Sequence, residues 1–287
     1  MQSTIRSILN IKWNQIALGF DDAAIYILDI SNVSTLHTLK GHTQGPVWSL
    51  INIDKDEIAS AGAGILIKIW DISTEYCFRT LTGHTNCIWC LTRINVNQFA
   101  SGSSDYTIRI WDPATGNCLL TIMHKFESII CMAKIDENEF ACGYNDHIIR
   151  VWNISKDSSH MIAELEDHNG SINFFLKLRN NYLLSGSSDG TIKMWNTKNL
   201  QTLKIKTIGI SNKKSSILCM IKVRYHQIIT ATLDNFIKLW DIQNDQCLLS
   251  FNTDYVNCFM KVNEMQIASC GNDFIVILDM KAFLNTN

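Results

Sequence analysis

Two stretches of this sequence are nearly identical: SGSSDYTIRIWD spans Ser101–Asp112, and SGSSDGTIKMWN spans Ser185–Asn196. A weaker copy of the same ending, IIRVWN, lies between them at 148–153. Each copy alternates apolar with polar residues, which is typical of a β-strand, and closes on Trp followed by Asp or Asn. A chain that repeats one strand motif at a regular period is built from stacked copies of one structural unit.

The closing strand of this motif recurs in seven phased copies. Its final Asp or Asn recurs every 38 to 45 residues, and each interval contains four short alternating runs separated by turn residues. A single four-stranded unit has two apolar faces and cannot bury them alone, whereas a closed ring of stacked units buries both. The copies read IYILD (25–29), LIKIWD (66–71), TIRIWD (107–112), IIRVWN (148–153), TIKMWN (191–196), FIKLWD (236–241) and IVILD (275–279).

Four short strands in each unit, with Gly-His and Trp-Asp signatures such as Gly83-His84 and Trp111-Asp112, resemble the WD40 family. The resemblance implies an all-β, seven-bladed WD40 β-propeller of four-stranded antiparallel blades, with the whole chain, 1–287, as one domain. Because only MKAFLNTN follows Asp279, we expect the seventh blade to lack a full outer strand or the chain to be part of a longer protein. The seam between the first and last blades is expected to be weak. The expected blades are 4–39, 40–80, 81–121, 122–165, 166–209, 210–251 and 252–287.

Composition and charge limit the classes of function. A formal net charge of −2 and the lack of a basic stripe argue against a nucleic-acid partner. No signal-like segment follows Met1 and no apolar run is long enough to span a membrane, so we expect no membrane partner and a cytoplasmic protein, with the nucleus as the alternative. Seven of the ten cysteines recur at two positions of the repeat, one in the first strand and one in the fourth, which favours free thiols packed in the core. The pair Cys87-x-x-Cys90 has no second pair at a zinc-site spacing, so we expect no metal and no cofactor.

A recurring set of residues contains the components of a hydrolase triad. By residue type, His84, Ser101 and Asp105 match such a triad. The other units keep only parts of the set; the second unit, for example, has Gly64 where the Asp belongs. A set that recurs and decays in this way is structural, and the WD40 resemblance implies hydrogen bonds from Trp through Ser and His to the Asp of a tight turn. The two complete sets are His84, Ser101, Asp105 and Trp111, and His168, Ser185, Asp189 and Trp195.

The loops that enter the first strand of each unit share one face of a propeller with the turns between the second and third strands. We call this face the rim, and binding residues usually lie on such loops. Its first position, twelve residues before the repeat Ser, holds Arg6, Trp48, Trp89, Ile130, Asn173, Leu218 and Asn257. Its second position, immediately before the turn Asp, holds Asp21, Ala63, Ser104, Asn145, Ser188, Leu233 and Asn272.

Aromatic residues dominate one part of the rim. Trp48 and Trp89, with Ile130 beside them, predict an anchor for a protein partner, because aromatic clusters of this kind are typical of binding hot spots. The alternative is that both rings pack under their own loops as core. WD40-like substrate receptors hold phosphorylated peptides with several arginines at such positions, but here only Arg6 lies there. A lysine-bearing loop at 203–216 either contacts acidic segments or is simply solvated.

These observations predict a non-catalytic scaffold, a monomeric propeller within a larger complex, that binds protein or peptide segments on its rim. One alternative is the substrate-recognition subunit of a ubiquitin-ligase-type complex, since strands such as DQCLLSF (245–251) look similar to those of such proteins, although no F-box-like segment is present. Another is a reader of modified histones or peptides, with the tryptophans as an aromatic cage. An enzyme is disfavoured because no Gly-rich phosphate loop, metal-ligand cluster or isolated carboxylate pair occurs.

Overall fold

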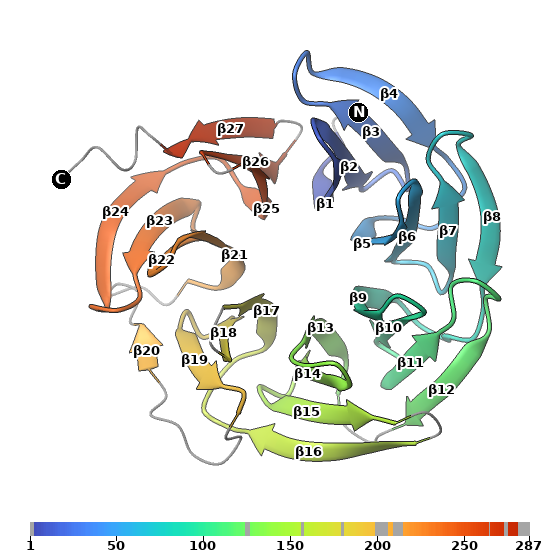
Figure 1. Ribbon diagram of the computed structural model, residues 1–287. Helices are drawn as coiled ribbons and strands as arrows, with labels where there is room; N and C mark the ends of the chain where they lie inside the picture. The colour runs from blue at the N-terminus through green and yellow to red at the C-terminus, as the bar shows by residue number, and fades with distance from the viewer. Residues whose placement is uncertain are drawn as a thin grey trace.

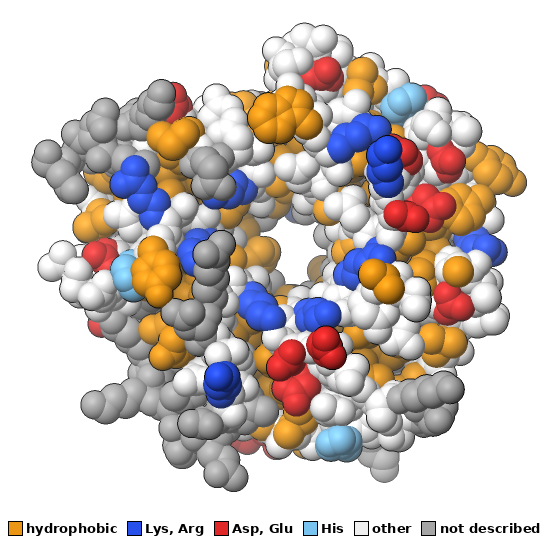
Figure 2. Space-filling view, viewed as in Figure 1, with side chains coloured by type: hydrophobic (Ala, Val, Ile, Leu, Met, Phe, Trp, Pro, Cys, Tyr) orange, Lys and Arg blue, Asp and Glu red, His pale blue; other side chains and the backbone are white. Residues whose placement is uncertain are grey.

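Seven β-sheets stand side by side in a closed ring (Figure 1), and the space-filling view shows a channel open at its centre (Figure 2). This computed structural model describes residues 3–123, 127–155, 158–178, 181–198, 206–208, 215–263, 265–272 and 275–280. Within each sheet the strands follow chain order and pair antiparallel, so each sheet is one blade of a propeller. The expected all-β, seven-bladed architecture is confirmed.

The blades use the strands in chain order from the channel outwards, so that β1, β5, β9, β13, β17, β21 and β25 surround the channel. The first three blades contain β1 (Ile5–Lys12), β2 (Gln15–Phe20), β3 (Ile25–Asp29), β4 (Ser34–Leu39), β5 (Val47–Asp54), β6 (Glu57–Gly62), β7 (Ile67–Asp71), β8 (Tyr76–Leu81), β9 (Ile88–Asn95), β10 (Gln98–Ser103), β11 (Thr107–Trp111) and β12 (Cys118–Met123). The remaining blades contain β13 (Ile129–Lys134), β14 (Glu139–Tyr144), β15 (Ile149–Ile154), β16 (Ser159–Leu165), β17 (Ile172–Lys177), β18 (Tyr182–Ser187), β19 (Ile192–Asn196), β20 (Lys206–Ile208), β21 (Ile217–Arg224), β22 (Gln227–Thr232), β23 (Phe236–Asp241), β24 (Gln246–Asn252), β25 (Val256–Asn263), β26 (Gln266–Gly271) and β27 (Ile275–Asp279).

Apolar side chains fill the spaces between neighbouring blades. Ile108 of the third blade, for example, lies in one cluster with Phe140 and Trp152 of the fourth. Burying each such side chain contributes about 1.5–3 kcal/mol, so the ring is stabilised by contacts between sheets. Glycine in the second strand permits the close approach, because a Cβ on Gly102 would lie 2.5 Å from Cγ2 of Ile129 in the next blade.

Among the described residues the seventh blade has three strands, β25, β26 and β27, as the sequence led us to expect. Its inner strands are nevertheless sealed against the first blade, since Met260 and Cys270 pack in one buried cluster with Ile5 and Leu18. The Asn257 side-chain amide also donates a 2.8 Å hydrogen bond to the Ile5 carbonyl. The weakness of the seam stays a prediction: the inner strands pack across it, and no further strand pairs with β27 in the described part of the chain.

We expect this open edge to be visible in amide hydrogen exchange. Backbone N–H groups of an edge strand face solvent, whereas those of the equivalent strand β11 are paired on both sides, with β10 and β12. Alternate amides of β27 should therefore exchange much faster than those of β11. Exchange of β27 as slow as that of β11 would mean that its edge is covered.

Candidate partner-binding rim

The structure brings the Trp, Ser, His and Asp of the repeat into one buried chain of hydrogen bonds. In the third blade, Trp111 Nε1 donates to Ser101 Oγ over 2.8 Å, and that oxygen lies 2.6 Å from His84 Nε2. His84 Nδ1 lies 2.8 Å from a carboxylate oxygen of Asp105. The set in the fifth blade has the same connectivity, with distances of 2.8, 2.7 and 3.0 Å for Trp195, Ser185, His168 and Asp189.

This chain has the connectivity of a catalytic triad but not its accessibility. The Ser101 and Ser185 side chains belong to residues with 0% exposure, so no substrate carbonyl can approach either hydroxyl. Each hydroxyl also accepts the indole N–H, which holds it inside the sheet. These sets satisfy the polar groups of buried side chains, which would otherwise cost free energy.

The backbone explains why the residue at the first rim position points out of the sheet, which the spacing of the repeats did not reveal. In every blade the residue at this position is the extra residue of a β-bulge at the start of the inner strand; Trp89, for instance, lies between Ile88 and Cys90, which pair with adjacent residues of β10. A bulge leaves one residue out of the ladder and redirects its side chain. The bulge therefore lifts this residue out of the sheet at the channel mouth.

The second rim position is held next to the first by a repeated backbone bond. In six blades its N–H donates to the carbonyl two residues before the first position, as Ser104 does to Cys87. The two positions also meet through side chains in three blades: Arg6 with Asp21, Trp89 with Ser104, and Asn173 with Ser188. In these blades the two rim positions therefore lie side by side at the same end of the inner strand.

An aromatic stack forms the most distinctive part of the rim. The rings of Trp48 and Trp89 are parallel to within 4°, with centroids 4.1 Å apart, and both residues are half-buried. Trp89 Nε1 donates to Ser104 Oγ over 2.6 Å, whereas Trp48 Nε1 has no hydrogen-bond partner among the described residues. The two rings are thus neither fully exposed nor part of the core; they cover each other and present an apolar edge, with half-buried Ile130 at the same position of the next blade.

The remainder of the rim combines paired polar residues with separate apolar ones. The Arg6 guanidinium holds the Asp21 carboxylate with two bonds of 2.6 and 2.9 Å. Asn173 donates to Ser216 and to the Ile217 carbonyl. The other expected rim residues occupy the positions predicted from the repeat. Leu218 is half-buried, and Leu233 and Asn145 are exposed. Asn257 is half-buried and hydrogen-bonded across the seam. Arg6 therefore has little capacity left for a phosphate group.

The opposite end of the channel carries a group of basic residues, although the net charge of the whole chain is slightly negative. The sixth residue of the inner strand's repeat is basic in five consecutive blades, and Lys and Arg side chains gather around the channel mouth in Figure 2. Lys134 and Lys177 donate to the carbonyls of Ile94 and Ile135 in the preceding blades. The expectation that the chain has no basic stripe is therefore wrong. Comparing equivalent positions of the repeat in the sequence would have revealed these basic residues. The five residues are Arg93, Lys134, Lys177, Lys222 and Lys261.

Comparison with known proteins places this propeller in a family. The profile of the family described as WD domain, G-beta repeat matches residues 33–71, 75–112 and 159–196. Each matched segment runs from the outer strand of one blade through the third strand of the next, for example β4 to β7. Seven phased repeats, seven blades and these matches make the chain a β-propeller built of repeated blades. The three matched repeats and the seven-bladed ring support its assignment to the WD40-repeat propeller family. No curated protein matches the chain.

All ten cysteines are free thiols, but Cys118 and Cys247 in the outer strands are exposed. The expectation of core packing is therefore wrong for these two, because the outer strand faces solvent on its free edge. In the described part of the chain, no helix is long and apolar enough to cross a membrane, and no three His, Cys, Asp or Glu side chains gather to hold a metal ion. The loop at 203–216 lies largely outside the described residues.

The buried chain of hydrogen bonds predicts a loss of stability when its central hydroxyl is removed. Ser101→Ala leaves His84 Nε2 and Trp111 Nε1 without a partner. The free energy of unfolding should therefore fall by about 2–4 kcal/mol. Urea denaturation measures this change. Ser73→Ala, which removes an exposed hydroxyl bonded only to Asp71, is the matched control and should change little. An unchanged midpoint for Ser101→Ala would contradict the structural role.

The fifth blade predicts a loss of stability in acid. Burial alone would raise the pKa of Asp189, but hydrogen bonds from Thr191 and Asn169 outweigh it and lower this pKa to about 2. A carboxyl group with a lowered pKa stabilises the fold above its unfolded pKa, and this contribution is lost as pH falls through the folded value. The stability difference between the natural chain and Asp189→Asn should therefore shrink between about pH 4 and about pH 2. Urea midpoints that keep a constant difference over this range would contradict the assignment.

Proposed function

We propose that this protein is a non-catalytic scaffold that binds segments of partner proteins on its rim. The observation that supports the proposal best is the Trp48–Trp89 stack, because two half-buried indoles lie together at the channel mouth with one ring nitrogen unpaired. Aromatic side chains held by their neighbours lose little entropy on binding and are enriched at binding hot spots. Propellers of the WD40 family are commonly protein-interaction scaffolds, which agrees with this function.

Two finer alternatives have less support. A receptor for phosphorylated substrates needs rim arginines that are free, and Arg6 is engaged by both oxygens of Asp21. A reader of methylated lysine needs aromatic faces that surround the cation, but the two indoles are parallel and use one face each on the other. An apolar or aromatic anchor in the partner segment fits the exposed edge of the stack better than either ligand does.

Peptides selected from a display library on the natural chain would test this function. We expect their affinity for the double variant Trp48→Ala, Trp89→Ala to fall about tenfold or more, because truncating hot-spot aromatics typically costs over 1 kcal/mol each. The matched control is Trp13→Ala, since Trp13 is 83% exposed and lies in the turn between β1 and β2, at the other end of the inner strand.

Calorimetry on the same variants separates binding from folding. The double variant should bind less tightly while its thermal unfolding stays cooperative. Peptides that bind the double variant as well as the natural chain would show that the stack is not the anchor. Collapse of the double variant's cooperative unfolding would show instead that the indoles are core.

A further inference from the structure

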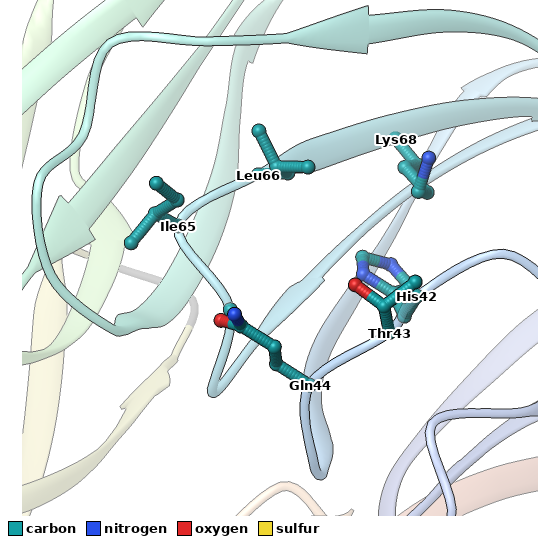
Figure 3. Close-up of a pocket in the computed structure, with 7 residues that line it drawn as sticks. His42, Thr43, Gln44, Ile65, Leu66 and Lys68 are labelled. Atoms are coloured by element: carbon teal, nitrogen blue, oxygen red, sulfur yellow. The ribbon is translucent and has the colours of Figure 1, made fainter.

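The second blade has lost one member of the buried chain of hydrogen bonds, and a pocket has opened at that place. Trp70 Nε1 donates to Ser60 Oγ over 2.7 Å, and His42 Nε2 lies 2.7 Å from the same oxygen. Gly64 stands where the third and fifth blades have Asp105 and Asp189. A pocket of about 150 Å³ lies here between the loop 42–44 and the turn 64–66, with Lys68 at its side (Figure 3).

The third blade shows what this space holds when the acid is present. One oxygen of Asp105 accepts hydrogen bonds from His84 Nδ1 and the Thr85 N–H, at 2.8 and 2.9 Å. The other accepts the Thr107 N–H at 2.9 Å. In the fifth blade the Asp189 carboxylate receives the equivalent three bonds, at 3.0, 2.8 and 2.8 Å. A threonine hydroxyl also donates to each carboxylate, from Thr107 over 2.7 Å and from Thr191 over 2.6 Å. The intact repeat therefore builds a cradle of one imidazole, one hydroxyl and two backbone donors around a carboxylate.

The second blade keeps the imidazole of this cradle, but its turn is wider. Strands β6 and β7 pair only as far as Ser60 and Lys68, whereas β10 and β11 pair as far as Gly102 and Ile108. Leu66 also stands where Thr107 offers its hydroxyl. The equivalent donors are His42 Nδ1 and the backbone N–H groups of Thr43 and Leu66, and none of the three has a hydrogen-bond partner among the described residues. The network assigns the imidazole proton: Ser60 accepts the indole N–H, and His42 Nε2 is the only acceptor for the Ser60 hydroxyl proton among the described residues, so Nε2 accepts that proton. Burial, and then the charge of Lys68, lower the pKa of His42 to about 4, so the neutral ring carries its proton on Nδ1.

The pocket also has room and a favourable charge for an anion. A Cβ on Gly64 would meet its nearest neighbour, Cβ of Gln44, at 3.8 Å, which is ordinary van der Waals contact. Lys68 Nζ donates to Thr80 Oγ1 over 3.2 Å, and no carboxylate pairs with it in the described part of the chain. A positive charge and unpaired donors at one partly enclosed place favour a negatively charged ligand.

We propose that this pocket binds a carboxylate group, supplied by an Asp or Glu side chain of a partner segment that lies on the rim. The partner's acid would occupy the place that Asp105 and Asp189 occupy in the intact blades. The pocket is well located for this, because Ala63, which precedes Gly64, holds the second rim position and Trp48 holds the first in the same blade. The proposal rests on the rim function proposed above, and its tests separate the two.

Acetate is the first probe. In a nuclear magnetic resonance titration at constant ionic strength, acetate should shift the Thr43 and Leu66 amide signals and the His42 ring nitrogens saturably. Acetamide, which has the same shape without the charge, should not. The same signals should not respond to acetate in Gly64→Asp, because the new side chain fills the cradle. A linear, non-saturating response to acetate, or an equal response in the variant, would overturn the proposal.

The Gly64 variants give a second readout that needs no ligand. Gly64→Asp should raise the urea midpoint above that of Gly64→Asn, because only the carboxylate presents two charged acceptor oxygens to the three donors. Gly64→Ala controls for the lower backbone entropy of a non-glycine residue in the unfolded chain. A midpoint for Gly64→Asp no higher than that for Gly64→Asn would show that the cradle does not select a carboxylate.

Rim-binding peptides distinguish failure of this proposal from failure of the rim function. For peptides that contain Asp or Glu, changing that residue to Asn or Gln should weaken binding about tenfold, and Gly64→Asp in the protein should weaken it similarly. If peptide binding requires Trp48 and Trp89 but neither change weakens it, the carboxylate proposal is wrong and the proposed rim function is unaffected. Saturable acetate binding without any rim-dependent peptide would show the reverse.

Discussion

Each blade of this protein depends on its two neighbours, because a twisted four-stranded sheet has apolar side chains on both faces. The first residue of the inner strand illustrates the constraint: it is Ile or Val in every blade and is at most 3% exposed. Such a sheet alone would leave half of these side chains in water, so the stable state is the one in which every face has a partner. The closed ring follows from this requirement, and the same apolar contact closes the seam even though β27 has no outer neighbour among the described residues.

Within each blade, a second constraint concerns the indole N–H of the closing tryptophan. This donor is buried and needs an acceptor, and the blades satisfy it in different ways. Ser101 accepts it in the third blade and Thr230 in the sixth. In the fourth blade the Ser is replaced by Cys142, and the Trp152 indole N–H reaches the hydroxyl of Tyr144 over 3.3 Å instead. The polar partner can change, but the need to pair the buried N–H persists.

The sequence predicted the repeat, the number of blades and the phase of the rim, because each depends on a strong periodic signal of apolar strands and turns. It did not predict how the rim residues interact. The bulge that places Trp89 at the channel mouth depends on backbone hydrogen bonds, which have no single-residue signature. The stack of Trp48 on Trp89 depends on the distance between adjacent blades, and the pairing of Arg6 with Asp21 depends on a turn meeting a strand. These are tertiary relations between residues whose identities alone suggested several arrangements.

The loss of the repeat's characteristic residues from single copies, such as the turn Asp in the second blade, can be explained in the same physical terms. Losing the turn acid removes stabilising hydrogen bonds from the second blade and leaves three donors facing a pocket, so the substitution costs stability in the isolated chain. The rest of the ring tolerates this cost, because the apolar interfaces on both sides of the blade are intact: Ile67 and Ile69 are fully buried against the third blade, and Ile58 against the first. A repeat protein can therefore convert one copy of a structural motif into a binding site, since the neighbouring copies maintain the geometry of the donors. On this reasoning, binding sites in such a ring are found by locating the blade where the shared polar network is incomplete and unpaired donors still line the space that the missing group has left.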